Sequence, residues 1–224
     1  DSLRPAFNSL SQRTMPQKGK TFERPRITQR VTMATQTEGV AAASQKMTLT
    51  SETVTKATQA GFLDITQQDI DWTEPSALEI VVQDFVDMYA EWTEGLATDF
   101  IEGQVTVGDT ASNGSTYSPW VVTNVATIAD SYIDGFIKVY GKAKRMPDTI
   151  YLDLAGWGLL ASTFNTNNDM TALALLRQSL SEFGATNVRM IVAPQFAANT
   201  RIIACSSLLE AYEQQKGLLR AELP

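Results

Sequence analysis

The chain has 224 residues, 43% of them hydrophobic, and a formal net charge of −7. It contains no histidine and one cysteine, which excludes histidine-dependent nucleophilic catalysis, histidine-based zinc sites and an internal disulfide. No apolar run reaches the roughly 18 to 20 residues of a membrane helix, and no secretory leader is recognisable, so we expect no membrane partner. The single Cys205 lies in the apolar run IIACSSLL, which predicts a buried structural thiol.

Charge is segregated along the chain. Residues 1–60 carry nine Lys and Arg against four Asp and Glu, a net of +5, whereas residues 61–135 carry fourteen acids and no base, a net of −14. Residues 136–224 carry nine bases and seven acids, a net of +2. The basic start could bind nucleic acid, lie on the acidic middle of another copy, or be a solvated surface. We favour self-association, because the basic segment has few aromatic residues and no recognised nucleic-acid motif.

The first elements are extended. Residues 1–17 are polar with two prolines, which predicts an arm that is ordered only if something holds it. Residues 18–34 and 47–59 alternate like strands around a small polar stretch at 35–46, which predicts a long β-hairpin. Pro25 interrupts the first strand, as an edge or bent strand allows. Neither face is apolar enough to bury a core, and an isolated hairpin is marginal in water, so it should pack on another surface.

A long helix is predicted over residues 76–103. Ser76 can cap it, Glu79 completes a capping box, and Gly103 is the expected end. Its apolar residues recur at helical spacing and form one stripe, which predicts a rod under a sheet. The stripe consists of Leu78, Val82, Phe85, Tyr89, Trp92, Leu96 and Phe100. The acids fall together on a different face, at Asp84, Asp87, Glu91, Glu94 and Glu102.

Beyond a Gly/Ser/Thr-rich loop at 104–118, helices and short strands alternate, which predicts a compact α/β unit. The predicted helices lie within residues 119–145, 154–164 and 170–185, the last ending at Gly184. The predicted strands lie within residues 146–154, 187–194 and 200–206. Residues 207–215 are predicted to be helical or irregular, and residues 217–224 to start one more strand.

No catalytic constellation emerges. The acids Asp69, Asp71 and Glu74 alternate like metal ligands but lack the spacing of a calcium loop, so a solvated turn is the better interpretation, with a carboxylate enzyme as the alternative. The sequence GKAKR at 141–145 lacks a phosphate-binding glycine loop and reads as a cationic helix end. The GWG at 156–158 has no dinucleotide-binding spacing. We therefore expect no enzyme activity, no cofactor and no metal.

The order of elements resembles the major capsid proteins of tailed bacteriophages, a fold shared with encapsulins and the herpesvirus capsid floor. The resemblance covers nearly the whole chain, and rests on element order and hydrophobicity rather than on invariant residues. It is carried by the polar arm, the hairpin, the segment GFLDITQQDIDWTEPSALEIVVQDFVDMYAEWTEG, and the late strands in RMIVAPQFAANTRIIACSSLLEAYEQQKGLLRAELP. It implies an α+β fold with an N-terminal arm, an E-loop hairpin, a peripheral domain with a spine helix, and an α/β axial domain.

The resemblance also implies domain bounds and a function. The bounds are 1–17 for the arm, 18–68 for the E-loop, 69–118 for the peripheral domain with spine helix 76–103, 119–205 for the axial domain, and 206–224 for a return toward the peripheral domain that looks truncated. The function is self-assembly into hexamers and pentamers of an icosahedral shell around double-stranded DNA. Portal, scaffold or decoration proteins are further partners, and the virion is the location. The alternative is an encapsulin-type compartment that encloses an enzyme.

In the family the E-loop lies over a neighbouring subunit. Here that would bring basic residues of the hairpin near acids of the spine helix. The predicted assembly contacts are Lys20, Arg24, Arg26 and Arg30 on one side and Asp84, Asp87, Glu91 and Glu94 on the other.

Overall fold

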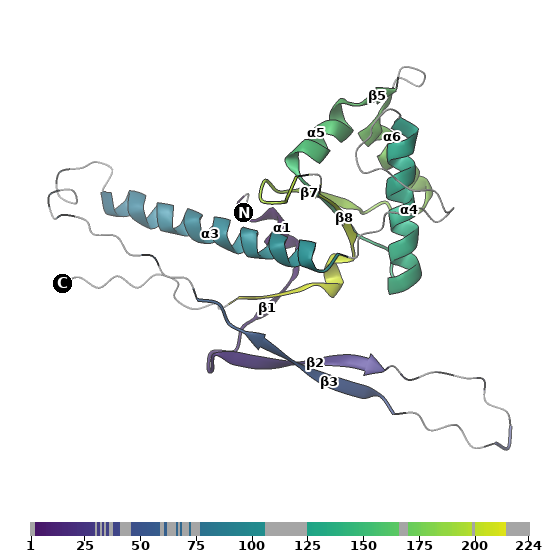
Figure 1. Cartoon of the computed structure of the whole chain (residues 1–224), viewed down its shortest axis with the longest axis horizontal. Coiled ribbons are helices and arrows are strands. Elements are labelled where there is room, and N and C mark those ends of the chain that lie inside the picture. Colours follow the sequence, from purple (N-terminus) through teal and green to yellow (C-terminus); the bar gives the residue numbers. More distant parts are fainter. Residues whose placement is uncertain are drawn as a thin grey trace. The chain divides into compact units, whose positions relative to one another are not determined.

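The computed structural model divides into two compact units, one of residues 1–13 and 65–213 and the other of residues 14–64 and 214–224. We call them the sheet unit and the hairpin unit, and describe each by itself (Figure 1). The structure describes residues 3–29, 31, 33, 35, 38–40, 46–58, 61, 66, 68, 72, 77–105, 125–165, 170–198 and 200–213.

The helices are α1 (Pro5–Ser9), α3 (Ala77–Gly103), α4 (Val125–Ala143), α5 (Leu154–Ser162) and α6 (Ala172–Glu182), with a 3-10 turn at Ser206–Leu208. The strands are β1 (Ser11–Thr14), β2 (Thr21–Gln29), β3 (Thr48–Thr55), β4 (Thr149–Leu152), β5 (Phe164–Asn165), β6 (Met170–Thr171), β7 (Arg189–Val192), β8 (Arg201–Ala204) and β9 (Glu210–Glu213). The predicted long helix and the alternating helices and strands after it are confirmed.

A three-stranded sheet in the order β7-β4-β8 organises the sheet unit. Strand β4 runs parallel to β7 and antiparallel to β8. All four of its residues are buried. A strand covered on both faces has no side that faces water, which explains why TIYL shows no alternation of polar and apolar residues.

One face of the sheet packs against helices α4, α5 and α6. Ile150 and Leu152 point to this side, because residues two apart in a strand share a face. Their buried neighbours are Tyr132, Phe136, Leu160, Ala172, Leu176, Leu180 and Ala185. Gly135 allows close packing of α4 on β8, since a Cβ there would lie 2.5 Å from the terminal methyl carbon of Ile203.

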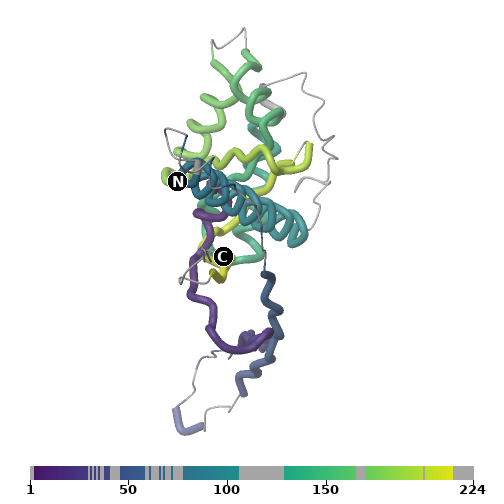
Figure 2. Tube along the Cα trace, turned by 90° about the vertical axis from the view of Figure 1, so that its left-hand side faces the viewer, coloured from purple at the N-terminus to yellow at the C-terminus, as the bar shows by residue number. Residues whose placement is uncertain are grey.

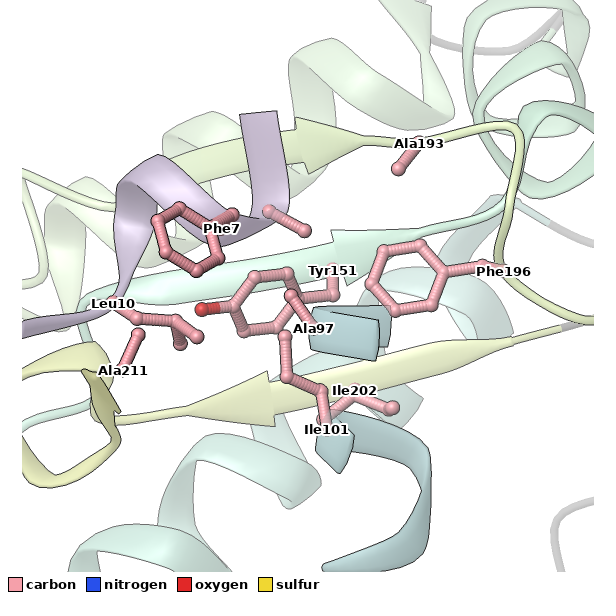
Figure 3. Packing of buried hydrophobic residues seen from close by; sticks show 10 residues of the cluster. Phe7, Leu10, Ala97, Ile101, Tyr151, Ala193, Phe196, Ile202 and Ala211 are labelled. Carbon is pink, nitrogen blue, oxygen red and sulfur yellow. The ribbon is translucent and has the colours of Figure 1, made fainter. Parts of the chain in front are cut away.

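The opposite face packs against α1 and α3. Tyr151 alternates with Ile150 and Leu152 and therefore points to this side, where its ring lies between Phe7 and Phe196 (Figure 3). The rings of Tyr151 and Phe196 are tilted at a centroid distance of 5.8 Å. The other buried members are Ala6, Leu10, Ala97, Ile101, Ala193, Ile202 and Ala211. The sheet is thus the middle of three layers.

Local signals fix the ends of the shorter helices. Asp153 accepts a hydrogen bond of 3.0 Å from the Gly156 amide at the start of α5, and Thr171 caps α6 in the same way. Gly184 has a φ of 87° and ends α6 with a 2.8 Å bond from the Ala185 amide to the Leu180 carbonyl. The helix end predicted at Gly184 is confirmed.

The hairpin unit contains the predicted hairpin. Strands β2 and β3 are antiparallel, from the pair Thr21 and Thr55 to the pair Ile27 and Leu49, and run side by side in both views (Figures 1 and 2). The register shifts by one residue between Ile27 and Gln29, which is a β-bulge. Since a two-stranded sheet consists of edge strands, Pro25 is tolerated within β2.

Two predictions about the chain ends are wrong. Residues 5–9 are helical rather than extended, and residues 11–14 pair with β9. Residues 210–213, predicted to be helical or irregular, form strand β9. The last predicted strand, at 217–224, and the Ser76 cap lie outside the described residues.

Candidate assembly surfaces

The two faces of the hairpin differ in chemistry. Arg24 and Arg26 lie on one face, opposite Glu52 and Thr50 on the partner strand. The other face carries Ile27 opposite Leu49, and these apolar side chains are 51% and 57% exposed. No residue of β2 or β3 is buried. The predicted need of the hairpin for another surface is consistent with this exposure.

The predicted basic contacts are accessible where the structure describes them. Lys20 and Arg26 are exposed and Arg24 is half-buried, while Arg30 lies outside the described residues. Lys56 fastens the base of the hairpin, because its Nζ donates to the Pro16 carbonyl and, at 3.2 Å, to the Lys18 carbonyl.

Helix α3 buries a face that the apolar stripe did not predict. Leu78 and Phe100 of the stripe are 48% and 42% exposed, Val82 and Leu96 are also exposed, and the remaining members are half-buried. At about 100° per residue, the buried face is centred about 120° from the stripe. Apart from Ile101, its residues are small or polar, which lets α1 and the sheet approach α3 closely. They are Ala90, Thr93, Glu94, Ala97, Thr98 and Ile101.

The acids of α3 do not share one environment. Asp84 and Glu91 are exposed, and Asp87 is half-buried and accepts a 3.0 Å bond from Gln83. Glu94 is 0% exposed, so its prediction as an assembly contact is wrong. Glu102 instead binds the loop between β7 and β8, where it accepts bonds from the Ala197 amide and the Thr200 hydroxyl.

Glu94 holds the start of the chain. Its two carboxylate oxygens accept bonds of 2.7 Å and 2.9 Å from the backbone amides of Ala6 and Phe7. These amides belong to the first turn of α1, where backbone N–H groups lack partners within the helix. Charge-assisted bonds of this kind are stronger than neutral ones and satisfy a carboxylate that burial would otherwise penalise.

A second cluster holds the same segment to β9. Both terminal nitrogens of Arg4 bind Glu213, at 3.0 Å and 3.1 Å, and the Arg4 guanidinium lies 3.9 Å from the centre of the Phe7 ring. Tyr89 of α3 donates a 2.9 Å bond to the same carboxylate. Burial, and then the bond to Glu213, raises the pKa of Tyr89 from 10.0 to about 12.

Further bonds continue along the segment. The Ser9 hydroxyl donates to the Ala6 carbonyl and lies 2.7 Å from the hydroxyl of Tyr151. The Ser11 amide donates to Leu209, and Arg13 pairs with Glu210 at 3.1 Å. We call residues 3–14 the strap, because they bind α3, β4 and β9 in turn. A recognisable signal for the strap was present in the sequence, since Pro5 is a favoured first residue of a helix and apolar residues follow at positions 6, 7 and 10.

The other sequence candidates show no reactive arrangement. Cys205 is buried as predicted, and burial raises the pKa of its thiol. The GWG stretch lies within α5, and the cationic cluster begins at Lys142 in the last turn of α4. Asp69, Asp71 and Glu74 lie outside the described residues. Within the described residues, no group of three or more Cys, Asp or Glu side chains could hold a metal ion. No helix in the described part of the chain could span a membrane.

Comparisons with known proteins show that the fold of this chain is similar to that of a solved structure. No protein-family model and no curated protein matches the sequence. A chain of a solved structure titled "Mycobacterium phage Cain" matches with a TM-score of 0.55 and 16% sequence identity, over 95% of this chain and 71% of that chain. At this identity the match speaks for the fold alone. The predicted α+β class, with a long helix and small sheets, is confirmed.

Proposed function

We propose that the chain is a structural protein of a bacteriophage particle, and specifically a major capsid protein that assembles into an icosahedral shell around double-stranded DNA. The observation that carries the proposal is a fold match over 95% of the chain with a chain from a mycobacteriophage structure. The element order that resembles tailed-phage capsid proteins supports the finer assignment. The proposal includes no catalytic step and no cofactor, and the shell encloses DNA without reading its sequence.

Under the capsid assignment, each part of the chain corresponds to a domain of the capsid fold. The hairpin at 18–68 is the E-loop, 69–118 with α3 is the peripheral domain, 119–205 is the axial domain, and 206–224 returns toward the peripheral domain. The arm at 1–17 differs from the simple expectation, because its first part is the docked strap. Copies of the chain in hexamers and pentamers are the main partners, with portal, scaffold or decoration proteins beside them in the virion.

In this proposal the hairpin of one copy lies on α3 of the next. Two observations support such a contact. The hairpin exposes apolar and basic side chains without a core, and α3 exposes most of its apolar stripe and carries no basic residue. The charged partners are Lys20, Arg24, Arg26 and Arg30 with Asp84, Asp87 and Glu91, without Glu94.

Apolar burial supplies most of the cohesion in this scheme. An exposed ion pair contributes only about 0 to 1 kcal/mol, whereas apolar surface contributes about 25 cal/mol per Å² buried. Opposite charge mainly speeds encounter and sets the register. Repetition of the same contact by symmetry then makes a durable shell from individually weak interactions.

Charge reversal in the hairpin tests the proposal. Replacing Arg24, Arg26 and Arg30 together by Glu should abolish or slow particle formation while leaving the circular dichroism of the monomer unchanged. Reversal of Lys142, Lys144 and Arg145 at the end of α4 is the charge-matched control and should assemble normally. Negative-stain electron microscopy and light scattering give the readout. Normal particles from the hairpin variant would count against the contact, and a wild-type chain that never forms particles would overturn the function.

The encapsulin-type alternative keeps the shell and changes its content. Particles isolated from their natural source separate the two, because a capsid contains DNA and a cargo compartment contains an enzyme.

A further inference from the structure

Several segments of the sheet unit meet at one end of its three-stranded sheet. Strands β4 and β7 are parallel and pair from Thr149 and Arg189 onward, so the chain enters both strands at this end. Strand β8 is antiparallel to β4 and pairs Ala204 with Thr149, so the chain leaves β8 at the same end. Helix α4 ends nearby in the sequence, since only residues 144–148 separate it from β4. Residues that are distant in sequence are therefore neighbours here.

Four basic residues gather at this end of the sheet. We call them the basic patch, and they are Lys142, Lys144, Arg145 and Arg189. The two arginines are tied to adjacent residues, because the Cys205 thiol donates to the Arg145 carbonyl at 3.7 Å and the Arg189 guanidinium donates a 3.1 Å bond to the hydroxyl of the next residue, Ser206. All four side chains are exposed, and within the described part of the chain none of them takes part in a salt bridge.

Arg189 is held in place by a network that ends on Asp148. The Ser206 hydroxyl, which accepts the bond from Arg189, donates a bond of 2.8 Å to the Asp148 carboxylate. That carboxylate also accepts bonds of 2.7 Å from the Ser206 amide and 3.0 Å from the Thr149 hydroxyl. The bond to Ser206 uses one of the guanidinium's donors and leaves others for a further acceptor. A guanidinium fixed in this way suits two-point binding of a phosphate group.

Lys144 has a backbone conformation that fold stability alone would assign to glycine. Its φ is 55°, and its amide donates a 2.9 Å bond to the Tyr140 carbonyl at the end of α4. Helices commonly end in this left-handed conformation, but the usual residue is glycine, because a side chain is disfavoured there. The Lys144 side chain is exposed, so packing does not explain it, and Lys142 already supplies a cation in the last turn of α4. Strain at such a residue is typical of functional positions.

We propose that the basic patch binds the phosphate backbone of double-stranded DNA. This deepens the proposed function and rests on it for the partner, since it names a surface by which the chain contacts the enclosed DNA. Duplex DNA carries one negative charge per about 1.7 Å of its axis, so it presents phosphates to all four clustered cations. Contacts to phosphate carry no base information, so this binding is independent of DNA sequence.

The composition of the surface favours DNA over an acidic segment of another copy. Phosphates are bound by Lys and Arg together with Thr and Asn, and the exposed Thr186 and Asn187 lie just before Arg189 at the start of β7. The cores of protein–protein interfaces are instead depleted in lysine, which makes up half of the basic patch.

Neutralisation tests the proposal in the unassembled chain. One variant replaces all four residues of the basic patch by Gln. The matched control replaces four basic residues of the hairpin unit by Gln, which changes the net charge equally, at Lys18, Lys20, Arg24 and Arg26. Fluorescence anisotropy of a labelled DNA duplex gives the affinity at several salt concentrations, with each chain kept at a concentration at which light scattering detects no particles.

The salt dependence separates the two variants. Each phosphate contact contributes about 0.9 to the slope of log affinity against log salt concentration, so the patch variant should lower that slope by about 3 to 4. Its affinity at about 50 mM salt should fall on the order of 100-fold or more. The hairpin control should change the slope by less than about 1. Equal losses in the two variants, or unchanged DNA binding in the patch variant, overturn the proposal.

Two pairs of variants keep the test decisive if the fourfold variant does not fold. Lys144→Gly removes one cation and relieves the strained φ, so its DNA affinity should fall about fivefold at physiological salt while its Tm stays equal or rises by up to about 4 °C. Arg189→Lys keeps the charge and loses the donor fork, so its affinity should fall about threefold, whereas Arg145→Lys should bind as wild type. Full affinity in Lys144→Gly, or equal affinity in the two arginine variants, overturns the proposal.

Particle formation separates this inference from the proposed function. The patch variant should still form particles, because its residues are not among the predicted assembly contacts. A patch variant that binds DNA normally but forms no particles overturns the proposal and assigns the surface to another copy of the chain. A wild-type chain that forms no particles removes the proposed function, whereas DNA binding by the unassembled chain still decides what the basic patch does.

Discussion

Strand β4 and the hairpin strands show two ways in which one chain uses extended structure. All four residues of β4 are buried, between helices on one face and α1 and α3 on the other. Strands β2 and β3 bury none of their residues, although they are the two longest strands described. The difference teaches that burial on both faces stabilises β4, whereas among the described residues nothing comparable covers the hairpin strands.

Helix α3 repeats the contrast within one element. Its second half contributes Ala97, Ile101 and Glu94 to the interior of the sheet unit, whereas Leu78, Ile80, Val82, Val86 and Met88 of its first half are exposed. Helices stabilised by tertiary packing bury one face against their own domain. The exposed apolar side chains in the first half of α3 are available to another copy of the chain, as the proposed assembly requires.

The largest expected effect is on the sheet unit, from Tyr151→Ala. The mutation empties the centre of the face shown in Figure 3 and should lower the free energy of unfolding by about 3 to 5 kcal/mol. Tyr151→Phe keeps the ring and loses only the bond to Ser9, so it should cost about 1 kcal/mol. Urea denaturation followed by circular dichroism measures both. Equal losses in the two variants would contradict the central packing role of the ring.

Alkaline pH offers a second way to weaken the sheet unit. The folded pKa of Tyr89, about 12, lies above its ordinary value of 10.0, because the phenol is buried and donates to Glu213. The unfolded chain therefore releases this proton first as pH rises. The stabilisation is complete below pH 10 and is lost as pH rises toward 12. Urea midpoints across this range should fall less steeply for Tyr89→Phe than for wild type, and parallel curves would contradict the assignment.

A smaller effect is expected from the backbone at the end of α6. Gly184 has a φ of 87°, which a side chain disfavours, so Gly184→Ala should destabilise the chain by about 1 kcal/mol. Gly158 is the control, because it lies inside α5 with an ordinary φ, and a Cβ added there would meet open space. Gly158→Ala should be neutral or stabilise by up to about 1 kcal/mol. Thermal unfolding of both variants checks the opposite signs.

The smallest effect on folding should come from the hairpin. Ile27→Ser combined with Leu49→Ser removes an exposed cross-strand pair, so the free energy of unfolding should change by no more than about 0.5 kcal/mol. Particle formation should nevertheless weaken, because the same residues are available to a neighbouring copy. A large loss of monomer stability would show that the hairpin packs within its own chain and would break the comparison.

Sequence patterns predicted the elements whose signals are local. The alternation on both sides of residues 35–46 predicted the hairpin, Gly103 and Gly184 marked helix ends, and the strand predicted within residues 146–154 is β4. The strap and β9 were not predicted, because their partners are distant. Ala6 binds a residue 88 positions away, and Arg4 binds one 209 positions away. Short segments of this kind have no periodicity that reveals a partner.

The assembly contacts predicted on α3 were only partly right, because they too depend on which distant segments pack against the helix. Helical spacing placed the apolar residues of α3 on one face and its acids on another, but spacing does not say which face the rest of the chain covers. Ala90, Thr93 and Ala97 are buried although nothing in their hydrophobicity distinguishes them, since close approach of backbones favours small residues. Glu94 shares a helical face with exposed acids, and only the position of α1 makes it an interior group.

The separation of the strap from β9 has a consequence for the order of synthesis. Arg4 is translated 209 residues before its partner Glu213. At about 5 to 20 residues per second, the strap waits roughly 10 to 40 s before β9 has been translated. The helices and strands between them can fold during that interval. The strap can therefore bind Glu94 of α3 first, and its pairing with β9 follows the synthesis of the helices and strands between them.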